Sequence, residues 1–453
     1  MSRFNNKDVK ETLSENDKKT IYILSVILLT IVIMLSANYV NSVLKENKNE
    51  SNFNNGRTST ATYSSDNKIT DSKSLTEGEY KSSKGDNNAI LVSGGTLTAS
   101  NISVNKTGDS SSTENADFYG INAGIVVTKG SANIKNSTIN TNGKGANAVF
   151  ATGENSKINI SDSSITTKGE SSSRGLDATN RGKINGNNLK ITTNGNSSAT
   201  LATDRGEGTV SVSNSTLKTN GTGSPIIYST GKISINKVSG VANNSQMVVV
   251  EGKNSASVTN SNLKASGKGN RGEDNKTDSS GVMIYQSMSG DAGVGTGSFT
   301  AKDSSLEISS DSTYYKTAPM FFVTNTNAKI NLTNTTLKYG SGVLLNICGT
   351  SEWGQNGSNG GTVKMYLYGE DIEGNIEVDK ISTLSIKLTN SKLSTQINKD
   401  NIAKKISLTL SKSSTLTLTG DSYVTSLDDE DSSYSNINLN GYSLYVNGKK
   451  LDI

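Results

Sequence analysis

The side chains with which this chain could do chemistry are carboxylates, lysines, arginines and tyrosines, because its 453 residues include no histidine. Histidine is the commonest general acid or base near neutral pH and a favoured zinc ligand. Acidic residues cluster at Asp428–Asp431, Glu370–Asp371 and Glu273–Asp274. We expect the first cluster to be a solvated charge run, with weak Ca²⁺ binding as the alternative, and Asp371 to be a turn residue.

Two short segments place acidic residues beside basic ones. Asp177 is flanked by Arg174 and Arg181, and Asp204 directly precedes Arg205. Hydrolysis of a glycosidic bond needs two carboxyl groups that face each other across that bond. Nothing in the spacing of these residues shows that they converge. We therefore predict that the chain has no catalytic residues and no metal site, needs no cofactor and is not an enzyme.

Aromatic and amide side chains in polar segments form the candidate ligand-binding site. Aromatic rings can stack on sugar faces while neighbouring amides bond sugar hydroxyls. The candidate residues are Trp353, Tyr314, Tyr315, Gln355 and Asn356. The alternative interpretation is that these rings only cover the small core of their own loops.

The element that must position these residues is an internal repeat. One unit contains a short apolar strand at Asn147–Gly153, an alternating strand at Lys157–Ile160, a polar corner at Asp162–Ser163 and a third strand that begins at Ile165. The same order recurs at intervals of roughly 21 to 30 residues, the size of one three-strand coil of a solenoid. The strands alternate with period two, which predicts one buried and one wet face.

The corner of each unit is an Asn or Asp followed by a small hydroxyl residue. Asn and Asp tolerate the left-handed backbone that a sharp turn needs, and stacked corners can form Asn ladders. These corners lie at Asn136–Ser137, Asp162–Ser163, Asn214–Ser215, Asn260–Ser261, Asp303–Ser304, Asn334–Thr335 and Asn390–Ser391. The sequence therefore predicts an all-β fold, a right-handed single-stranded parallel β-helix of about twelve coils, which at ~4.8 Å per coil is a rod roughly 55 to 60 Å long.

The repeat is interrupted between about residues 267 and 361. Insertions occur at Lys268–Ser280, Ser289–Gly297 and Ser351–Gly361. Insertions in a solenoid usually collect on one face, which is often the binding face. This placement is the reason for locating a ligand near Trp353.

An uncharged apolar run at Ile21–Ala37 predicts one membrane-spanning helix. We expect a cytoplasmic tail at 1–19, a transmembrane signal anchor at 20–40, a flexible polar tether at 41–87, the β-helix at 88–415, and a C-terminal coil with a capping hairpin at 416–453. The excess of basic residues before the helix predicts a single-pass protein of the cell membrane with the N-terminus inside and the β-helix outside. Whether the segment is cleaved, which would make the protein secreted, is left open.

Composition excludes several classes of protein. The 45 basic and 41 acidic residues are scattered and give a net charge of +4, so no patch for nucleic acid is expected. The single cysteine, Cys348, cannot form an intrachain disulfide. Only 32% of residues are hydrophobic, which leaves disorder or a solenoid with a narrow apolar strip per repeat. The agreement in phase between repeats favours the solenoid.

The coil pattern, together with Gln286–Ala292, Phe322–Thr326, Leu418–Val424 and Asn440–Tyr442, resembles exported pectate-lyase-like β-helix proteins of Gram-positive gut bacteria. These proteins are labelled adhesin-like, carbohydrate-binding or uncharacterised. The resemblance covers most of residues 88 to 453, and it is more specific for the fold than for the function.

The sequence thus predicts a membrane-anchored, non-catalytic cell-surface protein that acts as an adhesin or glycan-binding module. Its expected partners are the membrane, through the N-terminal helix, and extracellular or cell-wall glycans. The alternatives are a polysaccharide lyase or glycoside hydrolase of pectate-lyase-like fold, and a purely structural rod of the cell envelope. The ligand and the oligomeric state are left open.

Overall fold

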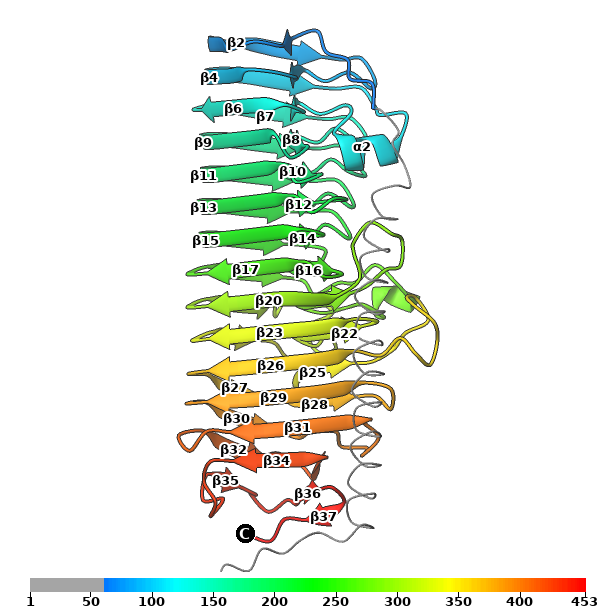
Figure 1. The fold of residues 1–453 in the computed structure, drawn as a ribbon, viewed down its shortest axis with the longest axis vertical. Helices are drawn as coiled ribbons and strands as arrows, with labels where there is room; N and C mark the ends of the chain where they lie inside the picture. The colour runs from blue at the N-terminus through cyan, green and yellow to red at the C-terminus, as the bar shows by residue number, and fades with distance from the viewer. Residues whose placement is uncertain (1–60) are drawn as a thin grey trace, which may run out of the picture. The chain divides into compact units, whose positions relative to one another are not determined.

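The computed structural model describes residues 61–453, which form one compact unit. This unit is a solenoid of parallel β-strands stacked coil upon coil (Figure 1). The predicted tail at 1–19, the predicted anchor at 20–40 and the first part of the predicted tether lie outside the described residues. Residues 61–453 contain no helix that is both long enough and apolar enough to cross a membrane.

The first sheet of the solenoid has twelve short parallel strands. In spatial order these are β1 (Lys68–Ile69), β3 (Ile90–Val92), β5 (Ile125–Val127), β8 (Val149–Thr152), β10 (Leu176–Thr179), β12 (Leu201–Thr203), β14 (Ile227–Ser229), β16 (Val248–Glu251), β19 (Val282–Tyr285), β22 (Phe321–Thr324), β25 (Val343–Ile347) and β28 (Asn375–Val378).

The second sheet contains strands of 3 to 12 residues, and the longest of them bend at the corner and continue. Its strands are β2 (Lys73–Ser82), β4 (Thr96–Lys106), β6 (Gly130–Lys135), β7 (Thr138–Thr141), β9 (Ser156–Thr167), β11 (Lys183–Thr193), β13 (Thr209–Thr219), β15 (Lys232–Ala242), β17 (Ser255–Thr259), β18 (Asn262–Ala265), β20 (Thr296–Lys302), β21 (Ser305–Ile308), β23 (Asn327–Thr333), β24 (Thr336–Lys338), β26 (Thr362–Tyr368), β29 (Thr383–Thr389), β31 (Lys405–Leu410) and β34 (Ser426–Asp429).

Two small sheets complete the C-terminal part. One contains β27 (Asp371–Glu373), β30 (Lys392–Thr395), β32 (Thr415–Leu418) and β35 (Ile437–Asn438), and the other contains β33 (Ser422–Val424), β36 (Leu444–Val446) and β37 (Lys449–Lys450). The helical elements between the strands are α2 (Thr113–Tyr119) and the short 3₁₀ turn η1 (Glu273–Asn275).

Strand β13 shows how the sequence builds one coil. Val210 and Val212 point into the core, and the alternation changes phase at Asn214, after which Leu217 points inward. Asn214 has a φ of 51°, in the left-handed region that Asn tolerates better than most residues. The phase change turns the chain while keeping the apolar side chains inside, so the buried rows of Ile, Val and Leu form one continuous core.

The hydroxyl residue after each corner has a defined role. Ser215 is buried, and its hydroxyl accepts the backbone N–H of Leu189 in the preceding coil, at 2.9 Å. This bond satisfies a buried donor that the bent strand leaves without a ladder partner. Equivalent bonds join Ile102 N to Ser137 (3.3 Å), Ser137 N to Ser163 (3.0 Å), Val238 N to Ser261 (3.0 Å), Ser261 N to Ser304 (3.1 Å) and Glu370 N to Ser391 (3.0 Å).

Two predictions about the ends of the solenoid meet different outcomes. The tether predicted for 41–87 is too long, because β1 and β2 pair in parallel with β3 and β4 and form the first coil. At the C-terminal end, where a capping hairpin was predicted, β36 and β37 are antiparallel around Asn447 and Gly448, whose φ values are 49° and 75°. Two left-handed residues at such a turn are typical of a tight hairpin.

Candidate functional site

Trp353 does not lie on an open surface. It is only 7% exposed and packs with Val249, Met283 and Phe322, and its ring meets that of Tyr285 edge-on at a centroid distance of 5.1 Å. A ring enclosed in this way offers no free face to a sugar. The prediction that Trp353 stacks on a ligand is therefore wrong for this arrangement.

The other residues of the predicted aromatic site are distributed over separate surroundings. Tyr314 and Tyr315 pack against the main core, and the Tyr314 hydroxyl donates to the carbonyl of Asp274 at 2.9 Å. Gln355 and Asn356 are exposed in the loop after the buried Trp353. Since Trp353 belongs to a different apolar cluster from the two tyrosines, the five residues do not form one aromatic platform.

Two of the inserted segments, through Trp353 and Asp291, and the segment around α2 cover the outer face of the first sheet. The outward residues of its strands lie in register from coil to coil, and almost all are buried. In order they are Leu91, Val126, Phe150, Asp177, Ala202, Tyr228, Val249, Met283 and Phe322. This cover is why, within residues 61–453, the outer face of the first sheet presents no open aromatic site.

A cluster of charged residues lies beneath this cover. Arg174 donates to Asp177 and pairs with Asp204, each at 2.7 Å from the same guanidinium nitrogen, and its other terminal nitrogen lies 3.1 Å from Asp117 of α2. Beside it, Arg205 pairs with Asp291 at 2.8 Å. The chain thus brings together Arg174, Asp177, Asp204 and Arg205, which the sequence placed near each other without showing convergence, whereas Arg181 is exposed and pairs with Glu154.

Burial governs the ionisation of this Arg174 cluster. Arg174, Asp177 and Asp204 are 8%, 0% and 4% exposed. Burial raises the pKa of Asp177 to about 6 against the opposing effect of Arg174, and burial also holds the pKa of Asp204 well above its usual range. Burial alone would lower the pKa of Arg174, but the charges of Asp117, Asp177 and Asp204 outweigh this effect and raise the pKa well above its usual value. Carboxyl groups with raised pKa values could serve acid–base chemistry, but the cluster is buried beneath α2 and offers a substrate no access in this arrangement.

A second buried network continues from this cluster along the same face. The hydroxyls of Tyr228 and Tyr285 both donate to one oxygen of Glu251, at 2.8 and 2.9 Å, and Ser287 donates to the other oxygen. The Arg174 guanidinium lies 5.9 Å from the Tyr228 ring centre. Glu251 is therefore a satisfied carboxylate that fastens the insertion after β19 to the first sheet.

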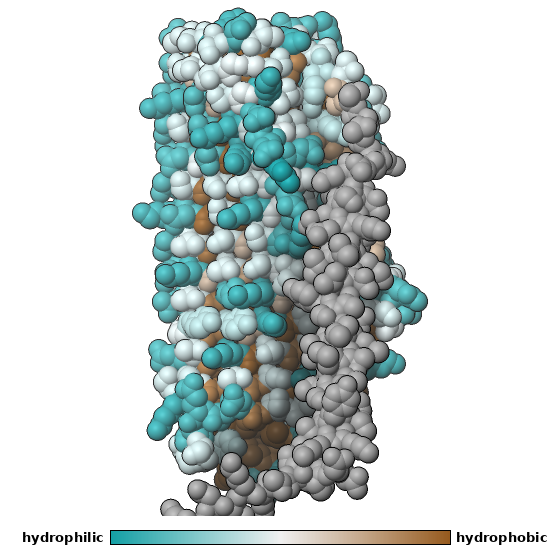
Figure 2. All heavy atoms as spheres, in the orientation of Figure 1, coloured by the Kyte–Doolittle hydropathy of each residue, from teal (hydrophilic) through white to brown (hydrophobic). Residues whose placement is uncertain are grey.

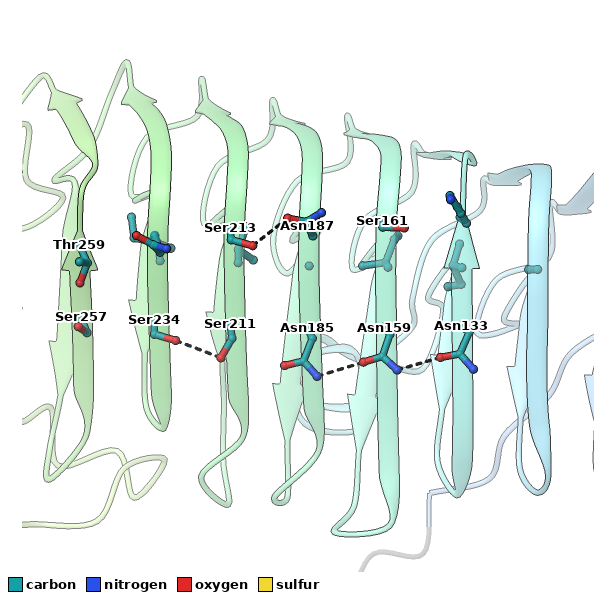
Figure 3. Close-up of a pocket in the computed structure, with 18 of the residues that line it drawn as sticks. Asn133, Asn159, Ser161, Asn185, Asn187, Ser211, Ser213, Ser234, Ser257 and Thr259 are labelled. Atoms are coloured by element: carbon teal, nitrogen blue, oxygen red, sulfur yellow. Dashed lines mark hydrogen bonds between the residues drawn. The ribbon is translucent and has the colours of Figure 1, made fainter.

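A shallow, open groove lies on the outer face of the second sheet. It measures about 970 Å³ and crosses seven coils, from β4 to β17 (Figure 3). Its lining includes rows of outward Asn, Ser and Thr side chains that repeat in register, together with Lys135 and parts of the strands' apolar residues. The lining residues with amide groups are Asn133, Asn159, Asn185, Asn187, Asn236 and Asn260. Polar side chains cover much of the face shown in Figure 2.

The amides of the groove form a ladder along the rod. The Asn159 side chain donates to Asn133 at 2.8 Å, and Asn185 donates to Asn159 at 3.1 Å. A side-chain amide has two N–H donors and an oxygen with two lone pairs. The ladder uses one donor and one lone pair of Asn159, so the amide keeps one of each for a ligand. Further along the same row, the Ser234 hydroxyl donates to that of Ser211 in the preceding coil at 3.0 Å.

Sequence reasoning did not single out the groove residues. They were visible only as the wet positions of the alternating strands, which every exposed strand has. The informative signal is the residue type: Asn stands at the same outward position in three consecutive coils, at Asn133, Asn159 and Asn185. Asn is depleted in strands, so its repetition there needs a reason beyond solvent exposure.

Comparisons with protein-family models, with curated proteins and with solved structures give no match. The resemblance to pectate-lyase-like proteins therefore rests on the residues that carry it.

Proposed function

We propose that the protein is a non-catalytic glycan-binding rod of the cell surface, and that its binding site is the groove on the second sheet. The observation that carries this proposal is the row of outward Asn, Ser and Thr side chains along the groove, which are hydrogen-bonded from Asn133 to Asn185 and again between Ser211 and Ser234. Amides and hydroxyls are the groups that exchange hydrogen bonds with sugar hydroxyls. The groove is long and open, which suits a linear chain rather than a compact molecule.

The remaining parts of the proposal concern how the rod is displayed. A right-handed winding is expected because crossover connections between parallel strands are almost always right-handed. The apolar run at Ile21–Ala37 is proposed to anchor the protein in the membrane, with the rod outside. An anchored rod with a groove along its side would hold a polymer parallel to its own axis.

Removal of amides from the ladder tests the groove. The double variant Asn159→Ala/Asn185→Ala should lose most of its binding to a panel of immobilised glycans, because two adjacent rungs lose their free donors and acceptors. The matched control is Asn331→Ala, at the equivalent outward position of β23, beyond the groove, where the amide bonds Thr300 at 3.2 Å. Binding that survives the double variant, or that Asn331→Ala abolishes equally, would overturn the assignment of the groove.

A second candidate function, cleavage of a polysaccharide, is favoured by Asp177 and Asp204, which share one nitrogen of Arg174. It requires α2 to leave its place over the cluster. Release of reducing or unsaturated sugar ends by the wild-type chain, and its loss in Asp177→Asn, would establish this activity. Absence of such products across neutral and acidic polysaccharides would leave the cluster a purely structural role.

A further inference from the structure

A row of lysines borders the groove. Lys157 and Lys183 are exposed neighbours on β9 and β11, and Lys232 follows two coils later on β15, all at the same outward position. Lys135 lies in the groove itself. The ammonium groups of Lys157 and Lys183 thus stand on adjacent strands, which are about 4.8 Å apart. Like charges placed directly opposite each other on neighbouring strands are unfavourable unless a counter-charge is present.

The groove offers these lysines little internal counter-charge. The groove lining contains no carboxylate within the described residues. At the corner beside it, Asp162 lies 3.9 Å from the Lys135 ammonium and accepts a hydrogen bond from Asn188. On the other side, Glu207 pairs with Lys253 at 2.8 Å.

Another acidic residue near the lysine row also has a basic neighbour. Glu154 lies 3.9 Å from the Arg181 guanidinium. The acidic groups around the groove are therefore matched by other basic residues, and the charge of Lys157, Lys183 and Lys232 is left in excess.

We propose that the ligand of the groove is an anionic glycopolymer, a linear hydroxyl-rich chain with an acidic group on its repeat unit. This inference rests on the proposed glycan-binding function of the groove. The Asn and Ser ladder bonds the hydroxyls, and the lysine row binds the carboxylates or phosphates. Lysine acts as a flexible point charge, so the row accepts either acidic group. Binding relieves the repulsion between Lys157 and Lys183.

The test compares two sets of lysine variants at the same outward position. The groove variant is Lys157→Gln/Lys183→Gln/Lys232→Gln. The control is Lys329→Gln/Lys364→Gln, whose residues occupy the continuation of the same row on β23 and β26, beyond the groove. Both sets remove exposed positive charge and leave the core intact. Thermal unfolding followed by circular dichroism checks that each variant is folded.

Affinity electrophoresis provides the measurement, with three polymers in the gel. Hyaluronate supplies carboxylates, its carboxyl-reduced derivative supplies the same hydroxyl-rich backbone without charge, and poly(glycerol phosphate) supplies phosphates. We expect the wild type to bind at least one of the two charged polymers and to bind the reduced polymer much more weakly. The groove variant should lose roughly tenfold in affinity for the charged polymer, and the control should be unchanged. Raising the salt to about 0.5 M should have the same effect as the groove variant.

The outcomes separate this inference from the proposed function. Equal binding of hyaluronate and its reduced derivative, lost in Asn159→Ala/Asn185→Ala but not in the lysine variant, would retain the glycan groove and overturn the anionic ligand. An equal loss in the groove variant and the control would reduce the effect to general charge and overturn it too. If none of the three polymers binds, the anionic ligand is refuted; the glycan panel then decides the groove independently.

Discussion

At the scale of single residues, the corner serine is the most regular device in the molecule. Its hydroxyl accepts a backbone N–H of the coil before it, and its own N–H bonds the next hydroxyl in the row. The sequence indicated the corner through the Asn–Ser pairs, and the left-handed Asn was predicted from side-chain chemistry. The burial of the serine was not predicted, because it depends on the neighbouring coil rather than on the residue itself.

Ser261→Ala should destabilise the solenoid by about 1 to 2 kcal/mol, because the buried Val238 N–H loses its acceptor. The midpoint of urea unfolding, followed by circular dichroism, measures this cost. Ser239→Ala is the matched control, since Ser239 is exposed on the neighbouring strand β15. Equal midpoints for the two variants would contradict the role of the corner hydroxyl.

Glu370 replaces serine in this row and makes stability depend on pH. Burial raises the pKa of Glu370 to about 7, against two hydrogen bonds from the Thr335 N–H. A raised carboxyl pKa means that the folded state holds the proton more tightly, so the contribution of Glu370 is fully present below pH about 4.5 and is lost as the pH rises to about 7.

Glu370→Gln should remove this dependence, because glutamine keeps an acceptor for Thr335 without a charge. We expect the variant to exceed the wild type in unfolding free energy by about 1 to 3 kcal/mol at pH 8 and to approach it near pH 4.5. Unfolding midpoints across this pH range measure the difference. The exposed neighbour Glu373→Gln should show no such convergence, and a constant gap between Glu370→Gln and the wild type would be evidence against a titrating Glu370.

At the scale of elements, α2 is held by contacts with distant residues that its own sequence does not predict. Ser112 caps its first turn by accepting the Asn115 N–H at 3.2 Å, and Arg174 holds Asp117. The Arg205 guanidinium lies 3.7 Å from the centre of the Phe118 ring. A helix of seven residues has too little periodicity to be predicted, so its position over the first sheet emerged only with the structure.

Arg174→Ala should destabilise the region around α2 by about 3 to 5 kcal/mol at pH 7, because Asp177 and Asp204 lose the cation that compensates their burial. The loss should be smaller near pH 4, where both carboxyls carry protons. Hydrogen exchange of the α2 amides is the appropriate measurement. The control is Arg181→Ala, which removes the exposed ion pair between Arg181 and Glu154, 3.9 Å apart. This variant should leave the exchange of the α2 amides unchanged. Unaltered exchange in Arg174→Ala would show that the cluster does not hold the helix.

The first coil shows why the predicted tether was too long. Strand β2 buries little besides Leu75 and carries Glu77, Glu79 and Lys81 on its exposed side. Within residues 61–453 this coil has a neighbouring coil on one side only, so it needs fewer apolar residues and more charges that discourage pairing of its outer edge. Its composition therefore resembles that of a linker.

At the scale of the whole described unit, the parallel solenoid followed from repeated corners and strand phase, whereas the groove did not. The position and shape of a groove depend on the angle of each corner. They also depend on which rows of outward side chains, at equivalent positions of successive coils, lie side by side. The enclosure of Trp353 was equally out of reach, since its partners Val249, Met283 and Phe322 come from three different coils. Repeats predict what is common to all coils, and the site depends on what differs between them.

The C-terminal segment that contains β35 and the hairpin of β36 and β37 covers one end of the rod, and we expect it to protect that end from edge pairing. Ile437 and Leu444 are buried there, and β35 covers the edge of β32. Deletion of residues 433–453 should expose this edge and cause the rods to associate, measured as a rise in molecular mass by light scattering. Deletion of residues 452–453 alone should leave the mass unchanged. A monomeric protein after the longer deletion would contradict the protective role.

Because the chain winds around the rod, the backbone joins each coil only to the next coil in the sequence. No covalent bond links a coil directly to the coil two positions away. A force that a bound polymer exerts along the rod axis would therefore act on the hydrogen bonds and side-chain packing between coils rather than on covalent backbone bonds. Under sufficient tension the coils would peel off from one end in sequence. Equivalent positions in neighbouring coils, such as Lys157 and Lys183, are separated by 26 residues of chain. Each coil that unfolds would therefore lengthen the chain by up to about 90 Å. Under load, such a rod would extend by unfolding its coils before it released the bound polymer, and so would act as a molecular shock absorber.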